Sequence, residues 1–321
     1  MQTAGLFAAA GEIQKAAAIE TGGVAWLTEH RRRVEFWGRE AGIDISRAID
    51  SDLGETVAVP TDMPLVDVLI PFHGADARWV ADAVLSAQLS QHVRPVIHVV
   101  ADGCEFPFDL QPDCLRYRTD GALNWGPYRI QNSLVKHGHC QSEWLAILDG
   151  DDLMTPDRLW RHIALLRQQS ADMISSAVAN VAADDSRAAR RRVQWQPVVR
   201  PGVRYPSCER GRCVNTCRTM RKAFFETMNG WADLKCSADF DFDNRARPIA
   251  EIIDDQRICG TRRLHGTSLS LGVAPPNSPD RQRDMQLVFS NQAAMKASPT
   301  PATAAQFGAL SAARPLRSCP C

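Results

Sequence analysis

Segments of strand character and segments of helix character alternate from residue 65 to residue 181. Apolar residues form short runs in the strand segments and recur every three or four positions in the helical ones. This alternation predicts an α/β fold with a Rossmann-like, mostly parallel sheet flanked by helices, because parallel strands need crossover connections. The predicted strands are 66–72, 96–101, 115–118, 144–148 and 173–181, and the predicted helices are 80–89, 128–137 and one marked by Leu159, Ile163 and Leu166.

Two segments of different composition flank the alternating region, which we place at residues 65–272. Residues 1–60 are predicted to form a helical extension that packs on the main domain or on a second copy. Its apolar stripe consists of Leu27, Val34, Trp37 and Ala41. Residues 275–321 mix Pro, Ser, Ala and polar groups, which predicts a poorly ordered, largely irregular tail interrupted by one helix at 280–296.

Charge and hydropathy exclude several classes of protein. The 321 residues include 37 basic and 37 acidic side chains, so no overall charge favours nucleic acid or an anionic membrane. No segment approaches the roughly 18 consecutive apolar residues of a membrane helix, and the N-terminus lacks the pattern of a signal peptide. We therefore expect a cytoplasmic protein without a transmembrane segment, although peripheral membrane contact stays open. The scattered cysteines are typical of reduced thiols.

In the segment WLAILDGDDLMTPDR, at residues 144–158, a predicted apolar strand is followed directly by the three acids Asp149, Asp151 and Asp152. Open α/β sheets bind their ligands at the carboxyl ends of strands. Three neighbouring carboxylates repel one another unless a cation compensates them, so their hard oxygen atoms predict Mg²⁺ or Mn²⁺. Thr155 is expected to cap the following helix, with a proline at its first position. The alternative is an Asp-rich turn beside a helix cap.

Further polar patches follow other predicted elements. Asp102 stands in an Asp-Gly pair at a strand end, which suits either a ligand contact or a simple turn. The acids of residues 237–242 alternate as on one face of a strand, whereas a helix would make them a one-sided acidic turn. The patches read PFHG at 71–74, ADG at 101–103, NWGPYRIQN at 124–132, SADFDF at 237–242 and RRLHGTSLS at 262–270.

In this order, the patches resemble the family 2 glycosyltransferases, which have the GT-A fold, over about residues 65–272. The strongest match is the Leu-Asp-x-Asp-Asp segment at 148–152 followed by Pro-Asp-Arg-Leu at 156–159. The sequence departs from the family pattern in three places. His73 and Gly74 replace the family's Tyr-Asn, Ala101 replaces the first Asp of its Asp-Asp-Gly-Ser turn, and Ala238 replaces the first carboxylate of its Glu-Asp pair.

The resemblance implies a metal-dependent, inverting transfer of a sugar from a nucleotide-sugar donor to an acceptor hydroxyl. It implies that Asp151 and His265 hold Mg²⁺ or Mn²⁺ and that Asp239 acts as the general base. The residues expected at the donor are Pro71, His73, Asp102, Arg129, Asn132 and Asp149. Acceptors in this family range over glycans, lipids and proteins, and the sequence identifies neither the acceptor nor the sugar.

Two alternatives remain. A haloacid-dehalogenase-like phosphatase would use Asp149 as nucleophile and Asp151 as acid/base, with Asp254 and Asp255 holding Mg²⁺. It fits less well, because Asp152 stands where that class has Thr or Val and because three strands precede the motif. A relative that binds nucleotide or glycan without turnover would explain the missing family residues. The chain has neither a Gly-x-Gly-x-x-Gly fingerprint nor a phosphate-binding P-loop.

Overall fold

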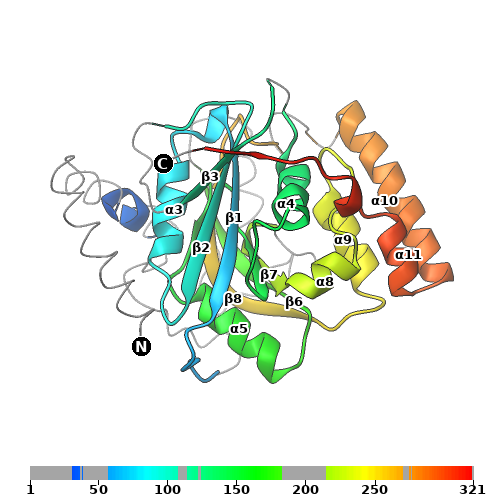
Figure 1. Cartoon of the computed structure of the whole chain (residues 1–321), viewed down its shortest axis with the longest axis horizontal. Coiled ribbons are helices and arrows are strands. Elements are labelled where there is room, and N and C mark those ends of the chain that lie inside the picture. The colour runs from blue at the N-terminus through cyan, green and yellow to red at the C-terminus, as the bar shows by residue number, and fades with distance from the viewer. Residues whose placement is uncertain are drawn as a thin grey trace.

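The computed structural model describes residues 31–36, 38, 57–107, 114–121, 124–182, 215–269, 275 and 277–319. Within them lies a nine-stranded sheet with the strand order β5-β8-β6-β7-β4-β1-β2-β3-β9 (Figure 1). The strands are β1 (Leu65–His73), β2 (Arg94–Asp102), β3 (Leu115–Arg118), β4 (Trp144–Ile147), β5 (Leu153–Met154), β6 (Met173–Ala182), β7 (Arg218–Arg221), β8 (Ile252–Leu264) and β9 (Arg317–Ser318).

The long ladders of this sheet are parallel. β1 pairs with β2 and β4, β2 pairs with β3, and β6 pairs with β8, all in parallel. The antiparallel pairs involve the short strands β5, β7 and β9. The structure therefore confirms the predicted mixed α/β fold with a mostly parallel central sheet.

Helices cover both faces of the sheet (Figure 1). In β1, Val66, Val68 and Ile70 point into one core, whereas Leu69 points into the other, as the two-residue period of a strand requires. The first core includes residues of α3 and α5, and the second includes residues of α4, α8 and α9. These helices are α3 (Val80–Gln88), α4 (Pro127–Lys136), α5 (Arg158–Gln168), α8 (Lys222–Thr227) and α9 (Ala238–Ala246).

One local prediction is wrong, and of the two alternatives left open for residues 237–242 the helical one is confirmed. Thr155 does not cap a helix, because α5 begins only at Arg158 and Thr155 directly follows β5, which pairs with β8. The Thr155 N–H instead donates to the carbonyl of Cys259 at 3.0 Å. The acids of residues 237–242 do not lie on a strand, because α9 begins at Ala238 and places Asp239 and Asp241 in its first turn.

The described part of the tail is ordered, which corrects the prediction of a largely irregular segment. It contains α10 (Pro279–Ala297), α11 (Pro301–Gln306), the 3₁₀ turn η4 (Leu310–Ala312) and β9, so the one helix predicted there is confirmed. Ser278 and Thr300 cap the two helices through side-chain oxygens. Figure 1 shows these helices packed beside α9 and the chain crossing back to the sheet. The tail residues buried in the second core are Val288, Met295, Ala304, Leu310 and Leu316.

Of the predicted N-terminal extension, residues 31–36, 38 and 57–60 are described, and residues 31–36 and 38 are helical whereas residues 57–60 are in neither a helix nor a strand. Val34 is fully buried, as the predicted stripe requires, whereas Leu27, Trp37 and Ala41 lie outside the described residues. Among the helices of the described segments, none combines the length and the apolarity needed to cross a membrane.

Candidate functional site

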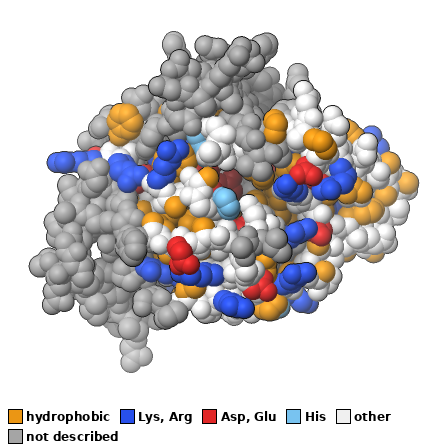
Figure 2. All heavy atoms as spheres, turned by 90° about the horizontal axis from the view of Figure 1, so that it is seen from above, with side chains coloured by type: hydrophobic (Ala, Val, Ile, Leu, Met, Phe, Trp, Pro, Cys, Tyr) orange, Lys and Arg blue, Asp and Glu red, His pale blue; other side chains and the backbone are white. Residues whose placement is uncertain are grey.

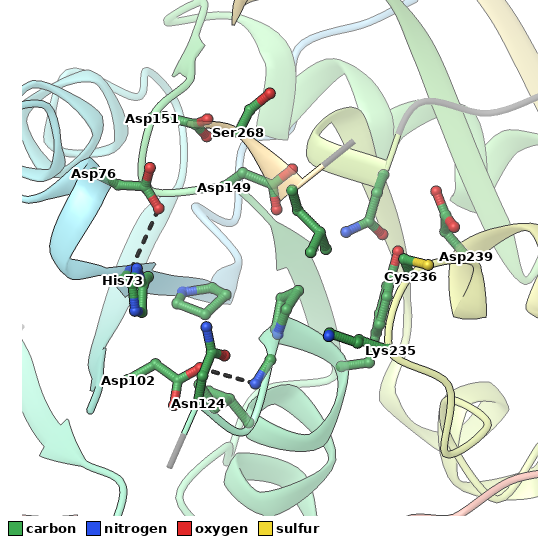
Figure 3. A pocket seen from close by; sticks show the side chains of 18 of the residues that line it. His73, Asp76, Asp102, Asn124, Asp149, Asp151, Lys235, Cys236, Asp239 and Ser268 are labelled. Carbon is green, nitrogen blue, oxygen red and sulfur yellow. Dashed lines mark hydrogen bonds between the residues drawn. The ribbon is translucent and has the colours of Figure 1, made fainter. Parts of the chain in front are cut away.

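A cavity of about 850 Å³ opens where β1, β2 and β4 end. Figure 2 views the molecule from above, with acidic and basic side chains gathered around a hollow. Figure 3 shows carboxylates from several elements directed into the cavity. Seven residues predicted as site residues line it: Pro71, His73, Asp102, Arg129, Asp149, Asp151 and Asp239.

The acidic loop after β4 is held against the end of β1. The N–H of Leu148 donates to the carbonyl of Leu69 at 3.1 Å, and the N–H of Gly150 donates to that of Pro71 at 3.2 Å. A Cβ atom at Gly150 would lie 2.6 Å from the Cβ of Phe72, so only glycine allows this close approach. The carboxylates of Asp149 and Asp151 are thereby fixed on either side of a tight backbone contact.

Three side chains in this region could hold a cation. One ligand atom from each of Asp76, Asp151 and His265 lies within 4.8 Å of the others. His265 Nε2 is 2.8 Å from Asp151 Oδ2, and its Nδ1 is 2.8 Å from the hydroxyl of Thr267. The Trp79 ring, 4.3 Å from the imidazole, also restrains the His265 ring. Two carboxylates and an imidazole suit Mg²⁺ or Mn²⁺.

Asp76 is a candidate ligand that the sequence interpretation missed. It ends the 3₁₀ turn η1 (Gly74–Asp76), which directly follows β1. The His73 N–H donates to Asp76 Oδ2 at 3.3 Å, so the end of β1 fixes the carboxylate. The available signal was an acid within three residues of a strand end at the ligand-binding edge.

Three carboxylates in and beside the acidic loop, those of Asp76, Asp149 and Asp152, have raised pKa values. Burial, and next the charge of Asp151, raise the pKa values of both Asp76 and Asp149 to about 7. Burial also raises the pKa of Asp152 well above its usual value, again with Asp151 as the next cause. A bound cation would relieve this mutual repulsion, so the raised pKa values agree with a cation site at Asp76, Asp151 and His265.

At the other end of the cavity, Asp102 organises a loop. Its carboxylate accepts hydrogen bonds from the backbone N–H groups of Trp125 and Gly126, both at 2.8 Å, and from the hydroxyl of Thr119 at 3.3 Å. Asp102 therefore lines the cavity as predicted, and it also fixes the loop that leads into α4. His73 lies nearby on β1, where its Nδ1 accepts the N–H of Ala75 at 3.5 Å.

The two predicted residues of α4 have different positions. Arg129 lines the cavity and forms an exposed ion pair with Asp233. Asn132 is buried and is not among the lining residues. Its amide donates to the Trp231 carbonyl at 3.0 Å and accepts the Trp231 N–H at 2.9 Å. The expectation that Asn132 contacts the donor is thus corrected, because both halves of its amide are bonded to the backbone of Trp231.

Asp239 lies in the first turn of α9 and faces the same cavity, opposite the acidic loop (Figure 3). Tyr128, which the sequence interpretation did not single out, is buried beside it. Burial, followed by the charges of Asp239 and Asp149, raises the pKa of this phenol well above its usual value. Asp243, which also lines the cavity, pairs with Arg218 at 2.9 Å, and burial raises the Asp243 pKa to about 6.

The acidic pair required by a phosphatase lies elsewhere. Asp255 is bound by Arg161 through two contacts of 3.0 and 3.1 Å, and Asp254 pairs with Arg247 at 3.0 Å. Neither carboxylate lines the cavity. Arg263, whose N–H donates to Asp152 of the acidic loop, lies eight positions after Asp255 on β8, which is about 25 Å along an extended strand. The structure therefore does not bring this pair to Asp149 and Asp151.

Two other groups of potential metal ligands are buried in the described part of the chain. In one, Asp67 bonds to His98 and to the Ser142 N–H. In the other, the two ring nitrogens of His162 contact the hydroxyls of Thr219 and Ser176. Hydrogen bonds within the protein already occupy these atoms. The groups are Asp67, His98 and Cys140, and His162, Asp255 and Cys259.

Comparison with known proteins identifies the fold. No family model matches the chain, and no curated protein matches its sequence. Among solved structures it resembles S. aureus TarS 1–349 in complex with UDP-GlcNAc, with a TM-score of 0.53 at 14% identity over 76% of this chain and 70% of that one. The complex of TarS 1–349 with UDP gives a TM-score of 0.51 at 14% identity, over 75% and 69% of the two chains. The chain therefore shares the TarS fold.

Proposed function

We propose that this protein is a glycosyltransferase that moves a sugar from a nucleotide-sugar donor to an acceptor hydroxyl. The observation that carries the proposal is the convergence of Asp76, Asp149, Asp151 and Asp239 in one cavity at the carboxyl edge of the sheet. The shared fold adds support, because TarS is described in complex with UDP and with UDP-GlcNAc. The motifs that resemble family 2 glycosyltransferases line that same cavity.

In this proposal, Asp151 and His265 hold Mg²⁺ or Mn²⁺, and Asp76 is the third metal ligand. The bound ion would act as a Lewis acid that offsets charge on the departing diphosphate. Asp149, directly beside Asp151, faces the donor from the same loop. Thr267 and Trp79 keep the His265 ring in place, and this lowers the cost of organising the site.

The donor nucleotide would lie along the ends of β1 and β2. There Pro71 and His73 form one wall, and the loop that Asp102 fixes forms the other. Arg129 would contribute positive charge at the cavity wall. Its ion pair with Asp233 is exposed, so a bound donor could replace Asp233 as its partner. Asn132 supports the same wall from behind, through Trp231.

Asp239 would accept the proton of the attacking hydroxyl. A single displacement with one base inverts the configuration of the sugar's anomeric carbon. Tyr128 lines the cavity close to both Asp239 and Asp149 and would help to orient the base. The acceptor, whether a glycan, a lipid or a protein, would reach Asp239 from the side of α10, whose Arg281, Met285 and Phe289 line the cavity.

The test is a panel of nucleoside diphosphate sugars screened with Mn²⁺ by thermal shift, followed by measurement of donor hydrolysis. A bound donor raises the apparent stability by mass action. Asp151→Asn should abolish the Mn²⁺-dependent shift, whereas Asp62→Asn, which alters an exposed pair with Arg167 outside the cavity, should leave it intact. Binding without hydrolysis or transfer would favour the non-catalytic alternative, and phosphate release from simple phosphomonoesters would contradict the transferase.

A further inference from the structure

A single buried carboxylate links the N-terminal segment to the acidic loop. Asp82, in the first turn of α3, is fully buried. Its Oδ2 atom lies 3.0 Å from Nη2 of Arg263 and 3.3 Å from Nη2 of Arg33. The Arg263 side chain is also fully buried, whereas that of Arg33 is 33% exposed. Two guanidinium groups from distant parts of the chain thus share one carboxylate oxygen.

Arg263 connects this pair to the candidate metal site. Its Nη1 donates to the backbone carbonyl of Asp151 at 2.9 Å, and its backbone N–H donates to Oδ1 of Asp152 at 2.9 Å. His265 follows two residues later on the same chain segment. The position of Arg263 therefore sets both the backbone that carries Asp151 and the segment that carries His265.

Arg33 belongs to the short helix at residues 31–36, which lies beside α3 in Figure 1. Its guanidinium also donates to the carbonyl of Arg78 at 2.6 Å. The neighbouring Val34 is fully buried in a small apolar cluster with Leu85, Leu153 and Val181. Leu153 directly follows Asp152, so the N-terminal segment packs against the back of the acidic loop.

Asp82 is a buried carboxylate, and losing a positive charge beside a buried carboxylate weakens the compensation of its charge. Asp82 is paired with the fully buried Arg263, and Arg33, whose side chain is 33% exposed, adds a second positive charge to the same carboxylate. Docking of the N-terminal segment should therefore favour the arrangement in which Asp82 and Arg263 hold the loop. Without Arg33, the loop has one fewer restraint at the point where it carries Asp151.

We propose that Arg263 is a positioning residue for the metal site and that Arg33 helps to hold Arg263 in place through Asp82. Metal affinity would then depend on docking of the N-terminal segment. This inference rests on the function proposed above for the cavity. It assigns to the N-terminal segment a role in ligand affinity, beyond its burial of apolar surface.

The experiment measures binding of Mn²⁺ alone, and then of UDP with Mn²⁺, to the full chain and to the variant Arg33→Ala. We expect roughly three- to tenfold weaker Mn²⁺ binding, at or below the low end of what outer-shell partners contribute. The matched control is Arg31→Ala, because Arg31 lies on the same helix and pairs with the partly exposed Glu35. Arg31→Ala should bind Mn²⁺ as the unchanged protein does.

Arg33→Lys keeps the charge and should recover part of the lost affinity, and Arg263→Lys should weaken Mn²⁺ binding about tenfold. Melting temperatures of all variants separate the two kinds of role. Equal Mn²⁺ affinities for Arg33→Ala, Arg33→Lys and Arg31→Ala would overturn the inference, even where Arg33→Ala lowers the melting temperature. If the unchanged protein binds neither Mn²⁺ nor UDP, the proposed function fails as well, so the two failures are distinguishable.

Discussion

The imidazole Nε2 of His265 lies 2.8 Å from Oδ2 of Asp151, although 114 residues separate the two in the chain. The short strand β5 explains this proximity. It begins at Leu153, directly after the acidic loop, and its two residues pair with Gly260 and Thr261 of β8. Because β8 ends at Leu264, the same pairing delivers His265 to the carboxylate. A two-residue strand thus assembles the candidate metal site.

Replacing His265 should weaken metal binding while the fold persists. His265→Asn removes the imidazole that contacts Asp151, and we expect Mn²⁺ affinity to fall by about tenfold or more, since even partners outside the direct ligands contribute that much. A calorimetric titration with Mn²⁺ measures the change in affinity. His137→Asn is the control, because His137 contacts the carbonyl of Ala313 on the exposed end of α4. Equal affinities of the two variants would remove His265 from the site.

Metal binding should depend on pH. The pKa values of Asp76 and Asp149 are about 7, above the value of about 3.9 for an unfolded Asp. The metal-free folded protein therefore binds more protons than the unfolded chain between these values, and its stability falls as pH rises from about 4 to 7. A cation must displace those protons. The stabilisation by Mn²⁺, measured as a melting-temperature shift, should be larger at pH 8 than at pH 5.5, and a shift independent of pH would contradict this assignment.

Asp239 should affect turnover more than binding. Asp239→Asn removes the proposed base without changing the size of the side chain, and we expect kcat to fall by about a hundredfold or more. Binding of UDP with Mn²⁺ should stay within about twofold, because Asp239 faces the acidic loop from α9 and is not in the candidate ligand set. Steady-state transfer rates and UDP titrations measure the two effects. A variant with full kcat would assign the base elsewhere.

Local apolar patterning was sufficient to predict most of the sheet. The strand predicted at 115–118 is confirmed at its exact ends, and the one predicted at 66–72 is one residue short at either end. Burial on both faces makes a strand such as β1 easy to recognise in the sequence, because its residues are almost all apolar. The acidic loop was equally easy to recognise in the sequence, since its three acids closely follow a strand.

Contacts between distant segments could not be predicted in this way. Asp76 follows β1 without any periodic signal, and only the pairing of β5 with β8 brings Asp151 and His265 to it. Asn132 matched a family motif, yet its amide is bonded to the backbone of Trp231, 99 residues away. The tail looked irregular because its buried apolar residues are few and widely spaced. Their burial depends on surfaces supplied by α4, α8 and α9.

Gly150 should tolerate no side chain. A Cβ atom there would lie 2.6 Å from the Cβ of Phe72 and 3.0 Å from the carbonyl oxygen of Pro71. Gly150→Ala should therefore destabilise the protein by about 1–3 kcal/mol, as overpacking does, and should also weaken Mn²⁺ binding by shifting Asp151. Denaturant unfolding and Mn²⁺ titration measure the two effects. Gly74→Ala is the control, because its new Cβ would meet Cys104 at an ordinary 3.5 Å.

Asn229 should anchor the C-terminal tail to the domain. Its Nδ2 donates to the carbonyls of Ala305 and Gly308 at 3.0 and 2.8 Å, and its Oδ1 accepts the N–H of Ser311 at 3.0 Å. Asn229→Ala removes all three hydrogen bonds, and at about 1 kcal/mol each the free energy of unfolding should fall by about 3 kcal/mol. Asn229→Gly loses the same bonds but accepts the positive φ of 53° without strain, so it should be less destabilised than the alanine variant. Chemical denaturation measures both variants, and a loss no larger than that of Thr227→Ala, which removes one exposed bond to Ala223, would show that other contacts hold the tail.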